Sequence, residues 1–191
     1  AHTGEMVQLK TPSGYRELDS AEYAVYEPQE GESYDDTAFK QFDTVNPSLA
    51  SPVAGVFEAL KNFLAAPEGE RVILILTARK QVVEQSVRNF LKQELEKETD
   101  EEKRRILLSA ASDIQFRGVG SSDPQLKVEV IKEYIAMLGQ DYEIQLVSFW
   151  DDSEKNVIAV REYLDSIGMP HDIAKPTITD TGKLSMPRYK E

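Results

Sequence analysis

From about residue 50 onward, the hydrophobic residues follow two alternating spacings. Short, uninterrupted apolar runs rich in β-branched residues predict buried strands, and apolar residues three or four positions apart predict helices. The predicted strands cover residues 72–76, 113–119, 143–150 and 171–178. The predicted helices cover residues 51–64, 81–95, 99–108, 124–138 and 153–167. Strands that alternate with helices of this length indicate βαβ units, so the predicted fold is α/β with a doubly wound parallel sheet.

The first 50 residues have a different pattern. Segments 7–10 and 15–18 flank the turn sequence Thr11-Pro12-Ser13-Gly14, which predicts a β-hairpin with a four-residue turn. A short helix is expected next, and residues 27–50 are acidic and irregular. We therefore expect an N-terminal insertion over residues 1–50, lying over one edge of the sheet, and an α/β core over residues 51–191.

Composition narrows the classes of protein that this chain can be. With 191 residues, of which 40% are hydrophobic, it fits one domain with a small insertion. No apolar run has the length of a membrane span and no secretory signal is visible, so a cytoplasmic location is expected. The net charge of −12 argues against nonspecific binding to nucleic acid. With two His and no Cys, a metal site would have to use oxygen ligands.

Polar residues follow three of the predicted strands. Thr77-Ala78-Arg79 follows the first, and Asp151 and Asp152 follow the third. Lys127 lies in the first turn of the helix that comes after the second strand. Because the carboxyl ends of parallel strands share one edge of a sheet, we expect Thr77, Lys127 and Asp151 to converge there in one cleft.

Each of these residue types suits the chemistry of a phosphate. A Thr77 hydroxyl can donate to a phosphoryl oxygen, and Lys127 can neutralise charge that develops during phosphoryl transfer. The helix that begins at Pro124 is expected to aim free N–H groups toward the same anion. Asp151 and Asp152 supply hard oxygens for Mg²⁺. Their alternative role, as a capping pair for the next helix, is less favoured because adjacent carboxylates after an apolar run repel each other without a cation.

The order of these motifs resembles the haloacid dehalogenase-like (HAD-like) superfamily over residues 50 to 165. Residues 73–79 resemble its second motif, Lys127 its third and residues 148–153 its fourth, while Asn156 continues a pattern of bacteriophage members. Residues 4–42 resemble the insertion of such phage proteins. The resemblance implies a Mg²⁺-dependent phosphohydrolase that acts on a phosphomonoester. The implied catalytic residues are Thr77 and Lys127, the implied substrate-binding residues are Thr77, Ala78 and Arg79, and the implied metal ligands are Asp151 and Asp152.

The first motif of that superfamily, an apolar strand ending Asp-x-Asp-x-Thr, is not found in the chain. Tyr34-Asp35-Asp36-Thr37 has no apolar run before it, so we reject it as the nucleophile motif. Because the chain opens at Ala1, we expect a longer parent protein with the nucleophilic Asp upstream, whether the parent was truncated or processed.

Two questions of function stay open at this point. The substrate is either a phosphorylated small molecule or a nucleic-acid end, for which a basic groove would come from Arg79, Lys80, Arg88 and Lys92; Arg79 is equally able to pair with surface carboxylates. The alternative to an enzyme is a non-catalytic HAD-like module that binds phage proteins, in the host cytoplasm or in the virion. The missing nucleophile is the main support for that alternative.

Overall fold

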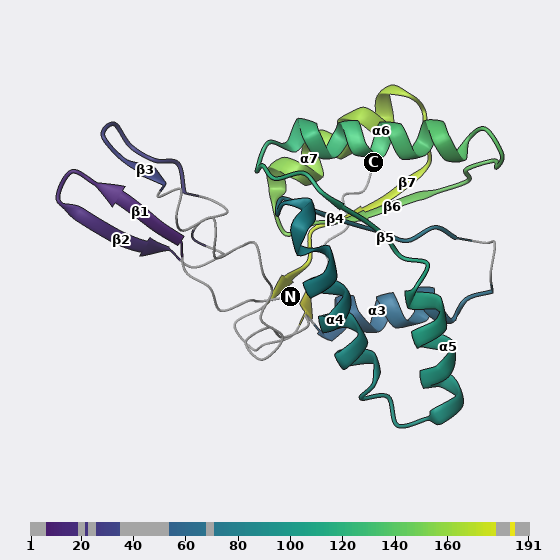
Figure 1. Cartoon of the computed structure of the whole chain (residues 1–191). Helices are drawn as coiled ribbons and strands as arrows, with labels where there is room; N and C mark the ends of the chain where they lie inside the picture. The colour runs from purple at the N-terminus through teal and green to yellow at the C-terminus, as the bar shows by residue number, and fades with distance from the viewer. Residues whose placement is uncertain are drawn as a thin grey trace. The chain divides into compact units, whose positions relative to one another are not determined.

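The computed structural model describes residues 7–18, 22, 26–34, 54–67, 71–178 and 184–185. Within these residues the protein is mixed α/β, with five α-helices and small parallel and antiparallel sheets (Figure 1). The described chain forms two compact units: one runs through Ile75 and again from Arg79 to Gly118, and the other comprises Leu76–Ala78 and the chain from Val119 onward. No helix in the described ranges is both long and apolar enough to cross a membrane.

The N-terminal strands form a small antiparallel sheet in the order β2-β1-β3. Its strands are β1 (Val7–Thr11), β2 (Gly14–Leu18) and β3 (Ser33–Tyr34). Thr11 pairs with Gly14, so the hairpin turn has two residues and the four-residue expectation is wrong. A positive φ of 138° at Gly14 accommodates this tight turn.

This sheet has an apolar side of its own. Val7, Leu9 and Leu18 are fully buried, with Tyr26 and Tyr34 packed against them. β3 was not predicted, because residues 27–50 were read as irregular. The short helix expected after the hairpin lies largely outside the described residues. Residues 35–50, which include most of the rejected segment Tyr34-Asp35-Asp36-Thr37, lie wholly outside them.

Three helices build the core of the first unit. They are α3 (Ala54–Ala65), α4 (Glu84–Leu95), which follows the 3₁₀ turn η1 (Gln81–Val83), and α5 (Glu101–Ala111). Their inward residues form one cluster with the start of the first core strand: Leu64, Leu91, Leu95, Leu107 and Ile114 are buried, and Phe57, Leu60, Ile73, Ile75 and Val87 pack against them. Of the residues that the helical spacing predicts to face inward, Leu64, Phe90 and Leu91 are buried, whereas Phe63 is 41% exposed.

Strands β4 (Leu74–Thr77) and β5 (Gln115–Gly118) form a pair. The Gln115 N–H donates to the Ile73 carbonyl at 2.8 Å and the Val119 N–H donates to the Thr77 carbonyl at 2.9 Å. Since both strands advance together between these bonds, the pair is parallel. The expectation that the 72–76 strand is buried on both faces is wrong, because every residue of β4 is only half-buried. β4 pairs with a single strand, β5, among the strands that the structure describes.

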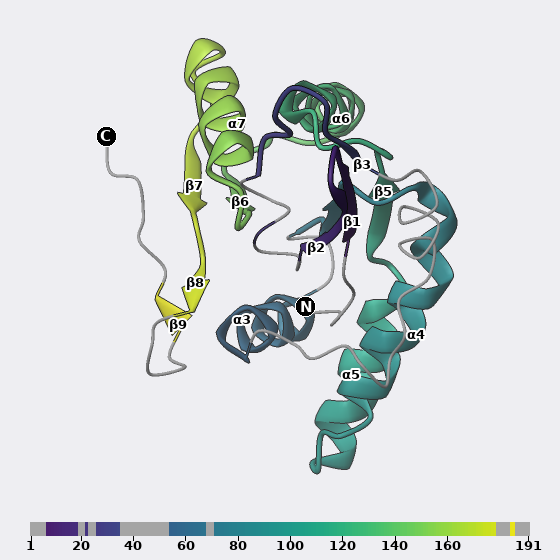
Figure 2. The ribbon, with the colours of Figure 1, turned by 90° about the vertical axis from the view of Figure 1, so that its left-hand side faces the viewer.

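The second unit contains a β-α-β arrangement. Strands β6 (Val147–Trp150) and β7 (His171–Ala174) are parallel, with Val147 opposite His171, and are joined through α7 (Glu154–Ser166). The helix α6 (Pro124–Leu138) has the predicted bounds and packs against α7. Figure 2 shows α7 alongside β6 and β7. The core of the unit combines all four elements: Val128, Ile131, Val157, Ala159, Val160, Leu164 and Ile173 are buried, and Leu76, Val147 and Phe149 pack against them.

The last predicted strand divides in two. β7 ends at Ala174, and β8 (Thr177–Ile178) pairs in an antiparallel sense with β9 (Leu184–Ser185). Pro176 separates the two strands and has no N–H for a ladder. The architecture that is shown is therefore mixed α/β, with parallel pairs β4–β5 and β6–β7.

The start of α5 provides a test of the structure. The predicted helix begins at Thr99, but the N-cap is Asp100, whose side chain accepts the Lys103 N–H at 2.9 Å. We expect Asp100→Ala to lower the free energy of unfolding by about 1 kcal/mol, because one N–H of the first helical turn loses its acceptor. Thr99→Ala is the matched control and should have little effect in urea unfolding. An equal loss in both variants would contradict the assignment of the cap.

Candidate functional site

Lys127 is the least expected residue of the second unit, because it is a buried charge. It lies in the first turn of α6 and is only 6% exposed. Its neighbour Val128 belongs to the apolar core, so the same packing that orients the helix turns Lys127 inward. An ammonium group so far from water requires a charged partner. That partner is Asp151, whose Oδ2 lies 2.6 Å from Lys127 Nζ.

Asp151 is fixed by hydrogen bonds of its backbone N–H and of both its carboxylate oxygens. It directly follows β6, and its backbone N–H donates to the Ala174 carbonyl at 3.3 Å, which continues the pairing of β6 with β7. Its Oδ1 accepts from the Ser153 N–H at 2.8 Å and from Asn156 Nδ2 at 3.0 Å. Its Oδ2 accepts from Asn156 Nδ2 at 3.1 Å as well as from Lys127. Each carboxylate oxygen therefore already accepts two hydrogen bonds, which uses the acceptor capacity of the group.

Asn156 is a site residue to which the sequence had assigned no role. It is buried on α7, where its amide nitrogen faces both oxygens of Asp151. Its Oδ1 is also buried and has no hydrogen-bond partner within the described part of the chain. Leaving such an acceptor unsatisfied costs about 1–3 kcal/mol. If the Asn156 amide were flipped, its oxygen would face the Asp151 carboxylate and repel it. The unsatisfied Oδ1 is therefore a consequence of the hydrogen bonds from Nδ2 to Asp151.

Asp152 does not share the buried position of Asp151. The structure leaves Asp152 exposed, whereas the Asp151 side chain is only 8% exposed. Successive side chains of an extended segment point to opposite sides, so adjacent carboxylates after a strand separate in this way. The expected sharing of one partly desolvated site by both charges is therefore wrong. The capping alternative is met in part, since Asp151 accepts the N–H of Ser153, the residue that precedes α7.

The N-terminus of α6 differs from the expectation of free N–H groups. Pro124 has no N–H, the Gln125 N–H donates to Asp123 Oδ1 at 2.9 Å, and the Leu126 N–H approaches the Asp123 carbonyl at 3.3 Å. Asp123 is thus the N-cap and places a carboxylate where the anion was expected. The positive charge near this helix end comes from Lys127 instead.

Thr77, Ala78 and Arg79 lie at the end of β4. Thr77 and Arg79 are half-buried and Ala78 is exposed. Thr77 belongs to the same unit as Lys127 and Asp151, and the preceding Leu76 packs against the core beneath them, whereas Arg79 belongs to the other unit. The contact between Lys127 and Asp151 is shown; their convergence with Thr77 in one cleft stays a prediction.

A cation could bind to Asp151 only by displacing one of the hydrogen-bond donors that contact its carboxylate. Among the described side chains, no group of three or more His, Cys, Asp or Glu residues is gathered as a metal site. Asp151 has the hard oxygens that Mg²⁺ prefers, but Lys127, Asn156 and Ser153 occupy them. To bind Mg²⁺, Asp151 would have to release at least one of these donors and gain ligands from elsewhere.

Comparisons of the chain with protein-family models, with curated proteins and with solved structures give no match.

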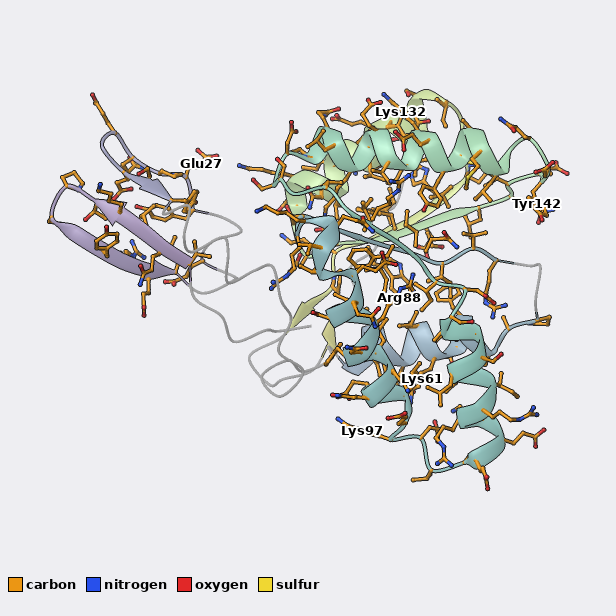
Figure 3. All side chains as sticks on the ribbon, viewed as in Figure 1. Glu27, Lys61, Arg88, Lys97, Lys132 and Tyr142 are labelled. Carbon is orange, nitrogen blue, oxygen red and sulfur yellow. The ribbon has the colours of Figure 1, made fainter. Side chains whose placement is uncertain are left out.

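Replacing Lys127 tests how much the buried pair contributes. Lys127→Met leaves the Asp151 charge desolvated without its ammonium partner, and we expect the free energy of unfolding to fall by about 3–5 kcal/mol. Lys132→Met on the same helix is the matched control, because Lys132 pairs with Glu129 at 2.7 Å on the surface (Figure 3). Its loss should be about 0–1 kcal/mol.

The double variant Lys127→Met with Asp151→Asn should recover part of the lost stability, since it removes both charges. Urea unfolding measures all of these variants. Equal losses in Lys127→Met and Lys132→Met would contradict the proposed importance of the buried pair.

Proposed function

We propose that this chain is the greater part of a HAD-like, Mg²⁺-dependent phosphohydrolase of phosphomonoesters, with its nucleophilic Asp in a segment upstream of residue 1. The observation that carries the proposal is the buried ion pair between Lys127 and Asp151. These are the residues that the resemblance names as the catalytic lysine and the metal ligand. Their contact brings two of the three predicted strand-end groups together.

Stability alone is a poor reason to bury such a pair. Two charges lose hydration on burial, and well-packed apolar residues of similar volume often stabilise a protein as well or better. Buried charges at the ends of strands instead suit a site where charge develops during a reaction. We therefore assign Lys127 the task of neutralising the transferring phosphoryl group, and Thr77 that of donating its hydroxyl to a phosphoryl oxygen.

The packing of β4 supports the doubly wound version of the fold. Ile73 and Ile75 pack with the core of α3, α4 and α5, whereas Leu76 packs with the core of α6 and α7. Alternate residues of a strand face opposite sides, so β4 carries apolar side chains that pack on both of its faces. The central strands of a doubly wound sheet have apolar residues on both faces.

The proposed reaction has two steps. The upstream Asp carboxylate attacks phosphorus and forms an acyl-phosphate bond while the ester P–O bond breaks, and the leaving alkoxide takes a proton from the second Asp of that upstream motif. Water then hydrolyses the acyl phosphate, gives a proton back to the second Asp and releases inorganic phosphate. Asp151 would hold Mg²⁺, which would supply charge neutralisation; the exposed Asp152 faces away from Asp151 and is not assigned to the same ion.

A small phosphorylated molecule suits the proposal better than a nucleic-acid end. Of the four residues expected to line a basic groove, Arg88 is engaged: its guanidinium donates to Glu84 Oε1 at 2.8 Å and to the Ile114 carbonyl at 2.9 Å. Lys92 lies 3.8 Å from the Glu96 carboxylate. The net charge of −12 also opposes a polyanion.

One observation favours the second candidate, a non-catalytic HAD-like module. Both oxygens of Asp151 are fully engaged by donors of this chain, so the Asp151 carboxylate is satisfied without a metal. In that case Lys127 and Asp151 would serve only to join α6 to the end of β6. The two candidates differ in turnover and in the response to Mg²⁺.

Turnover of a generic aryl phosphate in Mg²⁺ tests the enzyme directly. We expect residues 1–191 alone to be inactive, because the nucleophile is missing, and the protein with its upstream segment to be active. Asp151→Asn should abolish that activity, while Asp141→Asn, at an exposed position after α6, should preserve it. Robust Mg²⁺-dependent turnover by residues 1–191 alone would show that the nucleophile has been misplaced.

The melting temperature in Mg²⁺ separates the two candidates without an activity assay. Ligands that bind only the folded state stabilise it by mass action. We expect little or no Mg²⁺ stabilisation of residues 1–191, in which Asp151 is occupied, and a clear rise for the protein with its upstream carboxylates. Asp151→Asn should remove this rise. A rise that is equal in the wild type and in Asp151→Asn would rule out Asp151 as the metal ligand.

A further inference from the structure

The outer edge of β5 is closed by side chains rather than by another strand. Backbone groups of successive residues in a strand point to opposite neighbours. Gln115 and Val119 direct their N–H groups to β4, so the groups of Ile114 and Gly118 point to the other side. Unpaired strand edges of this kind are usually protected.

Three side chains provide that protection, and we call them the edge strap: Gln81, Glu84 and Arg88. Gln81 Oε1 accepts the Gly118 N–H at 2.9 Å, while its Nε2 donates to Glu84 Oε2 at 2.9 Å. Arg88 Nε donates to Glu84 Oε1 at 2.8 Å, and its Nη2 donates to the Ile114 carbonyl at 2.9 Å. The edge strap is thus a continuous chain of hydrogen bonds from the Gly118 N–H of β5 to the carbonyl of Ile114, the residue before β5.

The sequence spacing makes this arrangement regular. Positions 81, 84 and 88 recur at intervals of three and four, which places them on one side of η1 and α4. The hydrogen bond from Arg88 holds the pKa of the Glu84 carboxyl below its ordinary value, so Glu84 stays an acceptor at neutral pH.

Gly118 brings the chain after β4 against this edge. A Cβ at position 118 would lie 2.5 Å from the Lys80 carbonyl carbon, 2.6 Å from the Arg79 oxygen and 2.6 Å from the Gln81 nitrogen. Such distances are far inside van der Waals contact, and the obstructing atoms are backbone. Only glycine at this position lets residues 79–81 lie so close to β5.

We propose that the edge strap and Gly118 together fix the backbone of residues 79–81, and that Gln81 is a positioning residue for Arg79. The ligand that Arg79 would meet, a phosphate group, rests on the proposed function; the fixing of the backbone does not. Gln81 and Arg88 thereby stabilise both the outer edge of β5 and the loop that follows Thr77.

Amide hydrogen exchange followed by NMR tests the proposal on the 191-residue chain. Gln81→Met keeps the length of the side chain but removes both of its hydrogen bonds. We expect exchange at Gly118, Arg79 and Lys80 to become about ten-fold faster, because their local opening costs less free energy. Gln85→Met is the matched control, since Gln85 is exposed and bonds Asn89 on the surface of α4. Gln81→Glu keeps an acceptor for the Gly118 N–H and should recover part of the protection.

Titration with inorganic phosphate tests the positioning role. We expect the Kd for phosphate to rise about ten-fold in Gln81→Met and to stay unchanged in Gln85→Met. Gly118→Ala, which displaces the same backbone, should act in the same direction as Gln81→Met.

Three outcomes separate the claims. Unchanged exchange in Gln81→Met overturns the proposal. Faster exchange with an unchanged Kd for phosphate overturns the positioning role of Gln81. Faster exchange in a protein whose wild type binds no phosphate refutes the phosphate site of the proposed function and supports the fixing of residues 79–81 by the edge strap.

Discussion

The burial of one ammonium group, that of Lys127, organises the second unit of this protein. A charge so removed from water is tolerated only beside a carboxylate that is itself fully hydrogen-bonded. Asp151 meets that condition because it lies at the end of β6, where Ser153 and Asn156 from the following turn can donate to it. One ion pair therefore joins the first turn of α6, the end of β6 and the start of α7. The apolar core beneath these elements determines that the pair faces inward.

The same interaction controls what chemistry is available. An occupied Asp151 is a poor ligand for an incoming cation, because a metal must compete with a buried ammonium group. Asn156 carries a buried Oδ1 that has no hydrogen-bond partner among the described residues. Both oxygens of the neighbouring Asp151, in contrast, already accept two hydrogen bonds each. A cation or a donor from another segment would redistribute these bonds.

The sequence predicted best the elements whose ends are defined locally. The bounds of α6 were predicted correctly because Asp123 and Pro124 start the helix and Gly139 follows it. The strands were predicted too long, since β6 begins at Val147 rather than at residue 143, and strand ends depend on the neighbouring strand. The burial of β4 also depends on neighbouring strands, and among the described strands β4 pairs with β5 alone, so it is only half-buried.

The site was predicted as a set of residue types but not as a set of contacts. Lys127 and Asp151 were correctly expected to lie together, because strand ends gather at one edge of a sheet. The separation of Asp152 from Asp151 and the occupation of the α6 N-terminus by Asp123 depend on local backbone direction, which spacing alone does not specify. Arg88 was read as part of a basic groove because its partner, the Ile114 carbonyl, lies 26 residues away and leaves no mark in local composition.

The closed edge of β5 limits how the parallel sheet can grow. Because Gln81 and Arg88 satisfy outward-facing groups of β5, a further parallel strand would add to the β4–β5 pair along β4. The first three residues of β4 are apolar, and the whole strand is only half-buried, as expected of a strand that can accept another neighbour. A parallel strand placed there would end at the same edge as Thr77. A carboxylate directly after such a strand would therefore lie beside the Thr77 hydroxyl, which is where the proposed upstream nucleophile needs to be.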